Sequence, residues 1–185
     1  MKNTEFSLLP DDFFLVDVED GNTKEAYKTL SPSHTPVMLL SFAASKFTED
    51  ASNYFKQLFG LGSVDWRMLF LLSLKPGTTA AEASKTFGVD KGTVSRSVSR
   101  LTKGGLIVSG DLHANGRSRG LSLSPSGRET HDQLLAATLN QHHFLMKGFD
   151  EAEVKMFCNL LLRFTANLED LSKLNAQEHE EKALP

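Results

Sequence analysis

One face of the segment 91–103 is basic and polar. If the segment is helical, residues three or four positions apart share a face, because each residue turns by about 100°. Val94, Val98 and Leu101 then form an apolar stripe. The opposite face has no acidic residue and comprises Gly92, Arg96, Ser99, Arg100 and Lys103. Such side chains donate hydrogen bonds to phosphates and base edges, so this face predicts a contact with nucleic acid.

Start and stop signals place a shorter helix before this basic one. Thr79 and Glu82 have the spacing of a capping box, which predicts a helix from about residue 80. Gly88 can adopt the left-handed conformation that ends a helix. Asp90 is a favourable N-cap for the helix that follows. The pattern predicts two helices joined by a short turn, the second with one apolar face and an opposite basic face. This arrangement is typical of a helix–turn–helix that reads the major groove.

A hairpin with arginines near its tip follows the basic helix. Gly104 and Gly105 end the helix, and residues 106–108 and 121–123 have the pattern of two short strands. Asn115-Gly116 predicts a tight turn between them. Arg117 and Arg119 could then enter a narrow minor groove. A solvated basic surface on an ordinary helical domain is the alternative, but the order of the signals favours DNA binding.

Four runs of residues occur in a characteristic order: Trp66-Arg67-Met68-Leu69, 93–101, 103–107 and 121–127. Together these runs closely resemble the MarR family of bacterial winged-helix regulators. The resemblance covers roughly residues 36–174 and implies a mainly α fold with a small β-hairpin wing, a DNA-binding head and a helical dimerisation region. At the wing the family usually has an Asp-Arg-Arg run, whereas this chain has Asn115-Gly116-Arg117 and keeps only the last arginine.

We expect the DNA contacts to divide by type. Arg96 and Arg100 would contact bases or phosphates, and replacing either by alanine would cost roughly 1–3 kcal/mol of specific affinity if it reads a base. Arg117 would enter the minor groove. The full set of expected contacts is Lys91, Gly92, Thr93, Ser95, Arg96, Ser99, Arg100, Lys103, Asn115, Arg117 and Arg119.

The charge of the chain is unevenly distributed. Its 185 residues have a net charge of −3, which does not suggest a nucleic-acid binder. However, residues 85–128 contain eight basic and two acidic side chains, so this segment is +6 and the remainder is −9. A local basic patch is the electrostatic footprint of a DNA-binding surface. The acidic remainder would limit non-specific binding by other faces.

Outside the head, the pattern predicts an N-terminal arm, long helices and a tail. The arm, residues 1–35, mixes apolar and acidic residues. We expect it to pack on the body or on a partner subunit and to contain a short helix from Asn22 to Leu30. The alternative is a disordered tail. Residues 36–60 and 125–174 would supply dimerisation helices around the head, 63–124, with Ser63 capping its first helix. Residues 175–185 would form a frayed, flexible tail.

The last of these helices predicts a homodimer. Leu160, Leu162 and Phe164 spread apolar surface over more than one side, so the helix must be buried on more than one side. A two-fold dimer would present two heads to a palindromic operator. We therefore expect a transcriptional regulator, most simply a repressor, and no enzyme.

Resemblance to the family also implies a pocket for a small effector, often an aromatic acid, between the dimer helices and each head. The candidates in this chain are His34, Phe47, Trp66 and Arg67. Core packing is the favoured alternative for Trp66 and Phe47. Arg67 fits equally an anion partner and a surface ion pair.

Other chemistries have weaker support. Cys158 lies on the apolar last helix, so we expect a buried, inert thiol and not a redox sensor. His142-His143 with His34 or His131 has no clean metal-ligand spacing. We find no catalytic arrangement and expect no cofactor. No apolar stretch approaches the roughly 20 residues that span a bilayer. A single cysteine fits a reducing compartment, and the absence of a signal-peptide pattern favours the cytoplasm.

A different class of function stays open. A winged helix without operator binding could act as a protein-interaction module, which the altered wing and acidic net charge favour and the basic helix disfavours. A steep loss of affinity with salt would distinguish DNA binding from such an interface.

Overall fold

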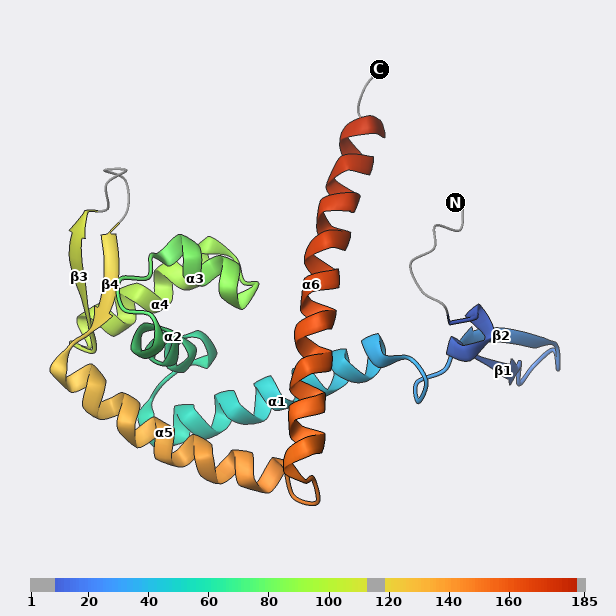
Figure 1. The fold of residues 1–185 in the computed structure, drawn as a ribbon, viewed down its shortest axis with the longest axis horizontal. Helices are drawn as coiled ribbons and strands as arrows, with labels where there is room; N and C mark the ends of the chain where they lie inside the picture. Colours follow the sequence, from blue (N-terminus) through green and yellow to red (C-terminus); the bar gives the residue numbers. More distant parts are fainter. Residues whose placement is uncertain (1–8, 113–118, 183–185) are drawn as a thin grey trace. The chain divides into compact units, whose positions relative to one another are not determined.

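The computed structural model describes residues 9–112 and 119–182. The chain divides into two compact units, residues 1–131 and 132–185. Its elements are mostly helices, with two small antiparallel hairpins (Figure 1), which confirms the predicted class. In chain order they are η1 (Asp11–Phe14), β1 (Leu15–Glu19), β2 (Ala26–Leu30), α1 (Pro36–Phe59), α2 (Ser63–Leu74), α3 (Ala80–Phe87), α4 (Lys91–Lys103), β3 (Ile107–Leu112), β4 (Arg119–Leu123), α5 (Pro125–Leu145) and α6 (Glu151–Lys182).

The core of the first unit lies where α2 packs against α1, α4 and β4, and α3 against α4 (Figure 1). Each of these elements contributes one apolar face, as the sequence periodicity predicts. Fully buried side chains are Phe55 from α1, Met68, Leu69 and Leu72 from α2, Ala83 from α3, Val94 and Leu101 from α4, and Ile107 and Leu121 from the strands. This core fixes the basic helix α4 to a rigid support.

The start of α2 differs from the prediction. Ser63 is its first helical residue, and Gly62 occupies the N-cap position with extended backbone. The reason is Asp65, whose Oδ2 accepts a hydrogen bond from the Gly62 amide at 3.0 Å. The carboxylate of the third helical residue thus bonds back to the N-cap amide, and its charge complements the positive end of the helix dipole.

The second hairpin, β3–β4, pairs Ile107 with Leu123 and Ser109 with Leu121, and an irregularity lies between Ser109 and Leu112. Both strands extend further toward the tip than the sequence pattern indicated. The loop after α2 joins the same sheet, because the Gly77 amide donates to the Leu121 carbonyl at 2.9 Å and the Leu121 amide to the Thr78 carbonyl at 3.0 Å. The hairpin is therefore held to the end of α2 by main-chain bonds.

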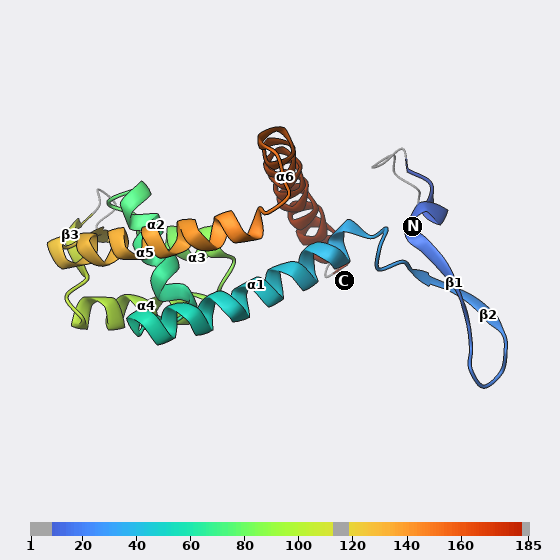
Figure 2. The ribbon, with the colours of Figure 1, turned by 90° about the horizontal axis from the view of Figure 1, so that it is seen from below.

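The N-terminal arm contains a hairpin, not the short helix expected from Asn22 to Leu30. Strands β1 and β2 pair from Leu15↔Leu30 to Glu19↔Ala26 (Figure 2). The Asp20 carboxylate accepts hydrogen bonds from the amides of Asn22 and Thr23, both at 2.8 Å. Asp20 thereby stabilises a turn at the position where Asn22 was expected to cap a helix, and the residues after it pair as a strand.

The second unit contains most of α5 and all of α6. Asp150 and Glu153 form a capping box at the start of α6, each accepting from the other's amide at 2.8 Å. The helix continues to Lys182, so the frayed tail predicted from residue 175 is helical over most of its length. In the part of the chain that the structure describes, no helix is long and apolar enough to cross a membrane.

Candidate nucleic-acid interface

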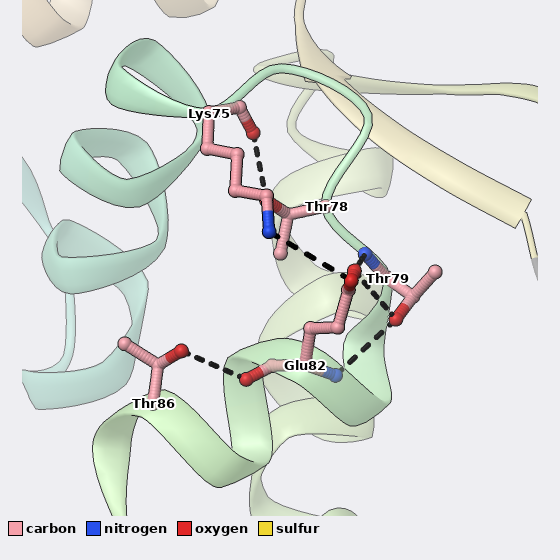
Figure 3. Close-up of polar contacts among 5 residues, drawn as sticks. All are labelled: Lys75, Thr78, Thr79, Glu82 and Thr86. Atoms are coloured by element: carbon pink, nitrogen blue, oxygen red, sulfur yellow. Dashed lines mark hydrogen bonds and ion pairs between the residues drawn. The ribbon is translucent and has the colours of Figure 1, made fainter.

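The turn between α2 and α3 is held by a polar network around Glu82 (Figure 3). The Glu82 carboxylate accepts from the Thr79 amide at 2.8 Å, and the Thr79 hydroxyl accepts from the Glu82 amide at 3.2 Å, which is the predicted capping box. Lys75 at the end of α2 pairs with the same carboxylate at 3.8 Å. The Thr78 hydroxyl donates to the Lys75 carbonyl at 2.7 Å. These contacts fix where α3 starts and therefore where the turn into α4 lies.

The first turn of α4 orients Arg96 through a chain of hydrogen bonds. The Asp90 carboxylate caps the helix by accepting from the Thr93 amide at 2.8 Å and the Thr93 hydroxyl at 2.5 Å. Arg96 Nη2 in turn donates to the Thr93 hydroxyl at 2.8 Å. The hydrogen bonds from Thr93 also lower the pKa of Asp90, so the cap is a carboxylate at neutral pH. An exposed guanidinium is thereby held over the N-terminal turn of the helix.

A glycine makes room for this arrangement. A Cβ at Gly92 would lie 3.1 Å from Asp90 Oδ1 and 3.3 Å from Arg96 Nη1. Any larger residue there would displace the ends of both side chains. The sequence pattern placed Gly92 on the basic face but did not indicate this need for a small residue.

The outward face of α4 is the one that the sequence predicted. Val94, Ser97 and Leu101 are buried, and Thr93 is half-buried. The exposed residues on this helix include Lys91, Gly92, Ser95, Arg96, Ser99, Arg100 and Lys103. The structure therefore brings the expected α4 residues to one accessible surface, and their contacts with DNA stay a prediction.

Arg100 has a partner inside the protein that the sequence did not reveal. Its Nε and Nη2 donate to the two oxygens of Asp65 on α2, at 3.1 and 2.8 Å. The buried Ser97 hydroxyl donates to Asp65 Oδ1 at 2.5 Å, and the Gly62 amide completes the set. We call these four residues the Asp65 clamp. Asp65 on α2 is more than 30 positions from both Ser97 and Arg100 on α4, so helix periodicity contains no signal for this link.

The Asp65 carboxyl group is charged despite its burial. Only 3% of the residue is exposed, and burial by itself raises its pKa. Hydrogen bonds from Arg100, Ser97 and the Gly62 amide outweigh this effect, so the pKa lies below its ordinary value. The clamp is therefore an ion pair, with 56% of the Arg100 side chain still exposed.

The wing is described only in part. Arg119 is exposed at the start of β4, and its Nη1 donates to the Gly110 carbonyl at 3.4 Å. Asn115 and Arg117, the other predicted wing contacts, lie outside the described residues.

The expected effector residues are not all brought together. Trp66 packs in an aromatic cluster with Phe55 and Phe70, with centroids 5.1 and 6.1 Å from its ring, which agrees with the core-packing alternative. Its Nε1 is nevertheless buried without a hydrogen-bond partner among the described residues. Arg67 lies over the Trp66 ring at 5.4 Å and donates to the Thr48 hydroxyl of α1 at 3.2 Å.

Of the other two candidates, Phe47 is 39% exposed on α1, next in sequence to the Thr48 that Arg67 contacts. His34 contacts the N-terminal arm instead, with Nδ1 at 3.2 Å from the Ser31 hydroxyl and its ring centroid 6.0 Å from that of Phe13. The structure thus brings Trp66 and Arg67 together and gives His34 other neighbours.

Cys158 is exposed in the single chain, so the expected burial of this thiol is wrong for the isolated protein. Its helix α6 leaves that side uncovered. Within residues 9–112 and 119–182, no group of three or more potential ligands could hold a metal ion. His131 is buried with its ring 5.3 Å from Phe70, while His142 and His143 are exposed.

One protein family matches the sequence of the head. Residues 59–118, from the end of α1 into the wing, match the MarR family. No curated protein matches the chain.

Solved structures share the fold over most of the chain. A MarR/EmrR family transcriptional regulator from Acinetobacter sp. ADP1 is 23% identical with a TM-score of 0.69, and the match covers 76% of this chain and 99% of that one. A MarR family transcriptional regulator from Silicibacter pomeroyi is also 23% identical, with a TM-score of 0.67 and coverage of 74% and 92%. MepR of S. aureus, in complex with DNA, is 18% identical, with a TM-score of 0.62 and coverage of 75% and 99%. At these identities the likeness shows a shared winged-helix fold.

Proposed function

We propose that this chain, a winged-helix protein of the MarR type, is a regulator that binds double-stranded DNA through α4 and the wing, and not an enzyme. The observation that supports this most directly is the face of α4. Lys91, Arg96 and Lys103 are exposed on it, Arg96 is oriented by the Asp90–Thr93 cap, and the helix rests on a buried core. Rigid presentation of a guanidinium is what a specific base contact requires.

We propose specific roles along this surface. Arg96 contacts bases, because it lies near the N-terminal turn that enters the groove in helix–turn–helix proteins. Thr93, Ser95 and Ser99 contribute contacts to phosphate or base edges, and Gly92 lets the backbone approach. Lys91 and Lys103 contact phosphates. Asn115, Arg117 and Arg119 provide the minor-groove contact of the wing.

We propose that the protein works as a homodimeric repressor on a palindromic operator. Large apolar side chains are exposed on α1, α5 and α6 of the single chain, which is the state expected of an uncovered subunit interface. They include Val37, Phe42 and Leu58 on α1, Leu139 and Phe144 on α5, and Met156, Phe157, Leu160, Leu162, Leu168 and Leu171 on α6. A two-fold axis would then present two α4 helices to two half-sites.

We propose that a small aromatic acid releases the DNA by binding near Trp66 and Arg67. The guanidinium would pair with the carboxylate, and the unpartnered indole Nε1 would gain an acceptor. Release requires that the ligand prefers the dimer state that does not fit DNA, because equal affinity shifts nothing. A thermal-shift panel of aromatic carboxylates, followed by release of labelled operator, tests this; no shift with any compound would contradict it.

The central test is fluorescence anisotropy with DNA from upstream of the protein's own gene and with scrambled DNA, at several salt concentrations. We expect sequence-selective binding whose logarithmic slope against salt is steep, about 0.9 for each phosphate contacted. Arg96→Ala should weaken specific binding by roughly 1–3 kcal/mol. Lys46→Ala on α1 removes one exposed positive charge outside the head and is the matched control.

Two results would contradict the proposal. Weak binding that is equal on both DNAs, repeated with genomic fragments selected for binding, would favour a protein-interaction module. Wild-type operator binding by Arg96→Ala would remove this residue from the reading surface.

A further inference from the structure

The two arginines of α4 share a face but have different partners. Arg96 and Arg100 are one helical turn apart, so sequence alone assigns both to the DNA surface. In the structure Arg96 donates to the exposed hydroxyl of Thr93, on its own helix. Arg100 donates to Asp65, a buried residue of another helix. The first contact points a guanidinium toward solvent, whereas the second ties α4 to α2.

Asp65 is saturated by this arrangement. Its Oδ1 accepts from the Ser97 hydroxyl at 2.5 Å and from Arg100 Nη2 at 2.8 Å. Its Oδ2 accepts from the Gly62 amide at 3.0 Å and from Arg100 Nε at 3.1 Å. Removing one donor leaves a buried charge short of a partner, which costs more than the bond itself contributes. The ion pair is therefore held strongly in one geometry.

Asp65 occupies one of the two donor edges of the Arg100 guanidinium. A guanidinium recognises guanine or phosphate most specifically through two parallel N–H groups. In Arg100, Nε and Nη2 form such a fork and both donate to Asp65. A base or phosphate would have to displace a buried carboxylate to take that fork. With 56% of the side chain exposed, Asp65 does not use the Nη1 end, so the clamp fixes the orientation of the guanidinium and leaves only a contact through Nη1 to be tested.

We infer that Arg100 is a positioning residue, which with Ser97 and Asp65 sets the angle between the packed helices α2 and α4, and that Arg96 is the arginine of α4 that contacts DNA. The inference rests on the proposed DNA binding and refines its residue roles. Bases are read only when side chains lie within a fraction of an ångström of their targets, so a clamp that fixes the helix axis determines specificity without touching DNA.

Ser97→Ala provides the sharpest test. Ser97 is fully buried, so it cannot touch DNA, and its replacement removes one oxygen and adds no bulk. We expect a loss of operator affinity of about fivefold or more with the salt slope unchanged, since coupled neighbours in one hydrogen-bond network interact at this level. Thr102→Val, at an exposed position of α4 outside the proposed contact residues, is the control for the loss of a hydroxyl from this helix.

Arg100→Lys and Arg100→Ala separate positioning from contact. Lysine keeps the charge that a phosphate contact needs but cannot donate two parallel bonds, so the clamp predicts that it also weakens operator binding. Arg100→Ala should leave the salt slope as it is in the wild type, whereas a phosphate contact would lower it by about 0.9. Each variant is measured well below its own unfolding temperature, with its active fraction found by stoichiometric titration, so that partial unfolding does not mimic the effect.

The results decide between the two roles. Weaker and less selective binding by Ser97→Ala and Arg100→Lys, at an unchanged slope for Arg100→Ala, supports the clamp. Wild-type affinity in both Ser97→Ala and Arg100→Lys overturns it, as does a lower slope for Arg100→Ala. If the wild type binds operator and scrambled DNA equally, the proposed function is wrong. That result is obtained with the wild type alone, so it is distinct from a failure of the clamp.

Discussion

At the scale of single residues, one small substitution in α4 should affect the stability of the fold and the affinity for operator DNA differently. Gly92→Ala adds one methyl group, 3.3 Å from Arg96 Nη1 and 3.1 Å from Asp90 Oδ1, which are the ends of flexible side chains. Alanine also favours a helix over glycine by up to about 1 kcal/mol. We therefore expect an unchanged or higher melting temperature together with weaker operator binding than in the wild type.

Another variant of α4, Arg96→Ala, sets an upper limit for this loss of operator affinity. Gly92→Ala shifts Arg96, so its loss of affinity should be smaller than that of Arg96→Ala, which removes the guanidinium. Calorimetry and anisotropy on the same preparations measure both quantities. Full operator binding by Gly92→Ala would show that the orientation of Arg96 has no importance for recognition.

The Asp65 carboxylate also predicts how stability depends on pH. Hydrogen bonding holds its pKa below the ordinary value of 3.8, so folding favours the charged form. Its contribution is complete above that value and is lost as the pH falls through the lower folded-state pKa. We expect the difference in unfolding free energy between the wild type and Asp65→Asn to be constant above about pH 5 and to shrink below about pH 4.

Urea unfolding at a series of pH values measures this difference. Asp50→Asn, at an exposed position of α1, controls for the loss of one carboxylate. If Asp65→Asn loses the same free energy at pH 3 as at pH 7, the carboxylate does not provide the stabilisation assigned to it.

At the scale of elements, close backbone contacts hold the wing to the rest of the head. A Cβ built on Gly127, in the first turn of α5, would lie 1.8 Å from the Leu106 carbonyl oxygen before β3. Neither backbone can move without breaking the Ser124 amide bond to the same carbonyl, at 3.0 Å. We expect Gly127→Ala to destabilise the fold by about 3 kcal/mol or more.

A second glycine provides the comparison. A Cβ at Gly21, in the turn of the N-terminal hairpin, meets no atom within 4 Å, so Gly21→Ala should leave stability unchanged. Chemical denaturation of both variants measures the difference. Equal stability of the two would mean that α5 and β3 separate easily at this contact.

The elements were predictable wherever a local signal defines them. The Thr79–Glu82 box and Asp90 cap the helices that they were expected to cap, because a capping bond joins residues a few positions apart. The hairpin of the arm was missed because its turn depends on Asp20, an Asx-type bond that competes with helix capping by the next polar residue.

Tertiary links were not predictable in the same way. Arg100 has the same spacing as Arg96, and only the fold brings it to Asp65. His34 was grouped with Trp66 by resemblance, yet the structure gives it neighbours in the N-terminal arm. Burial of Cys158 was inferred from an apolar helix, but an apolar helix is covered only if a partner lies on it.

At the scale of the whole molecule, the proposed dimer predicts which apolar residues matter. Leu160 is 49% exposed in the single chain, and a charged residue in a subunit interface would be buried without a partner. We expect Leu160→Glu to yield monomers by light scattering and to weaken operator binding by more than tenfold, because a single head makes about half of the phosphate contacts.

Asn159→Glu adds the same charge to the neighbouring exposed residue of α6 and is the control. A Leu160→Glu protein that remains dimeric and binds operator normally would exclude this part of α6 from the interface. Far-ultraviolet circular dichroism checks that both variants keep their helices.

The aromatic cluster on α2 gives the molecule an internal optical reporter. The chain has one tryptophan, Trp66, so all of the indole emission comes from the place where α1 meets α2. The Arg67 guanidinium lies 5.4 Å from the centroid of the Trp66 ring, and Trp66 directly follows Asp65 in sequence. Its emission colour and intensity therefore respond to rearrangement at this junction, so DNA binding and ligand binding can both be followed on the unmodified protein, without a dye.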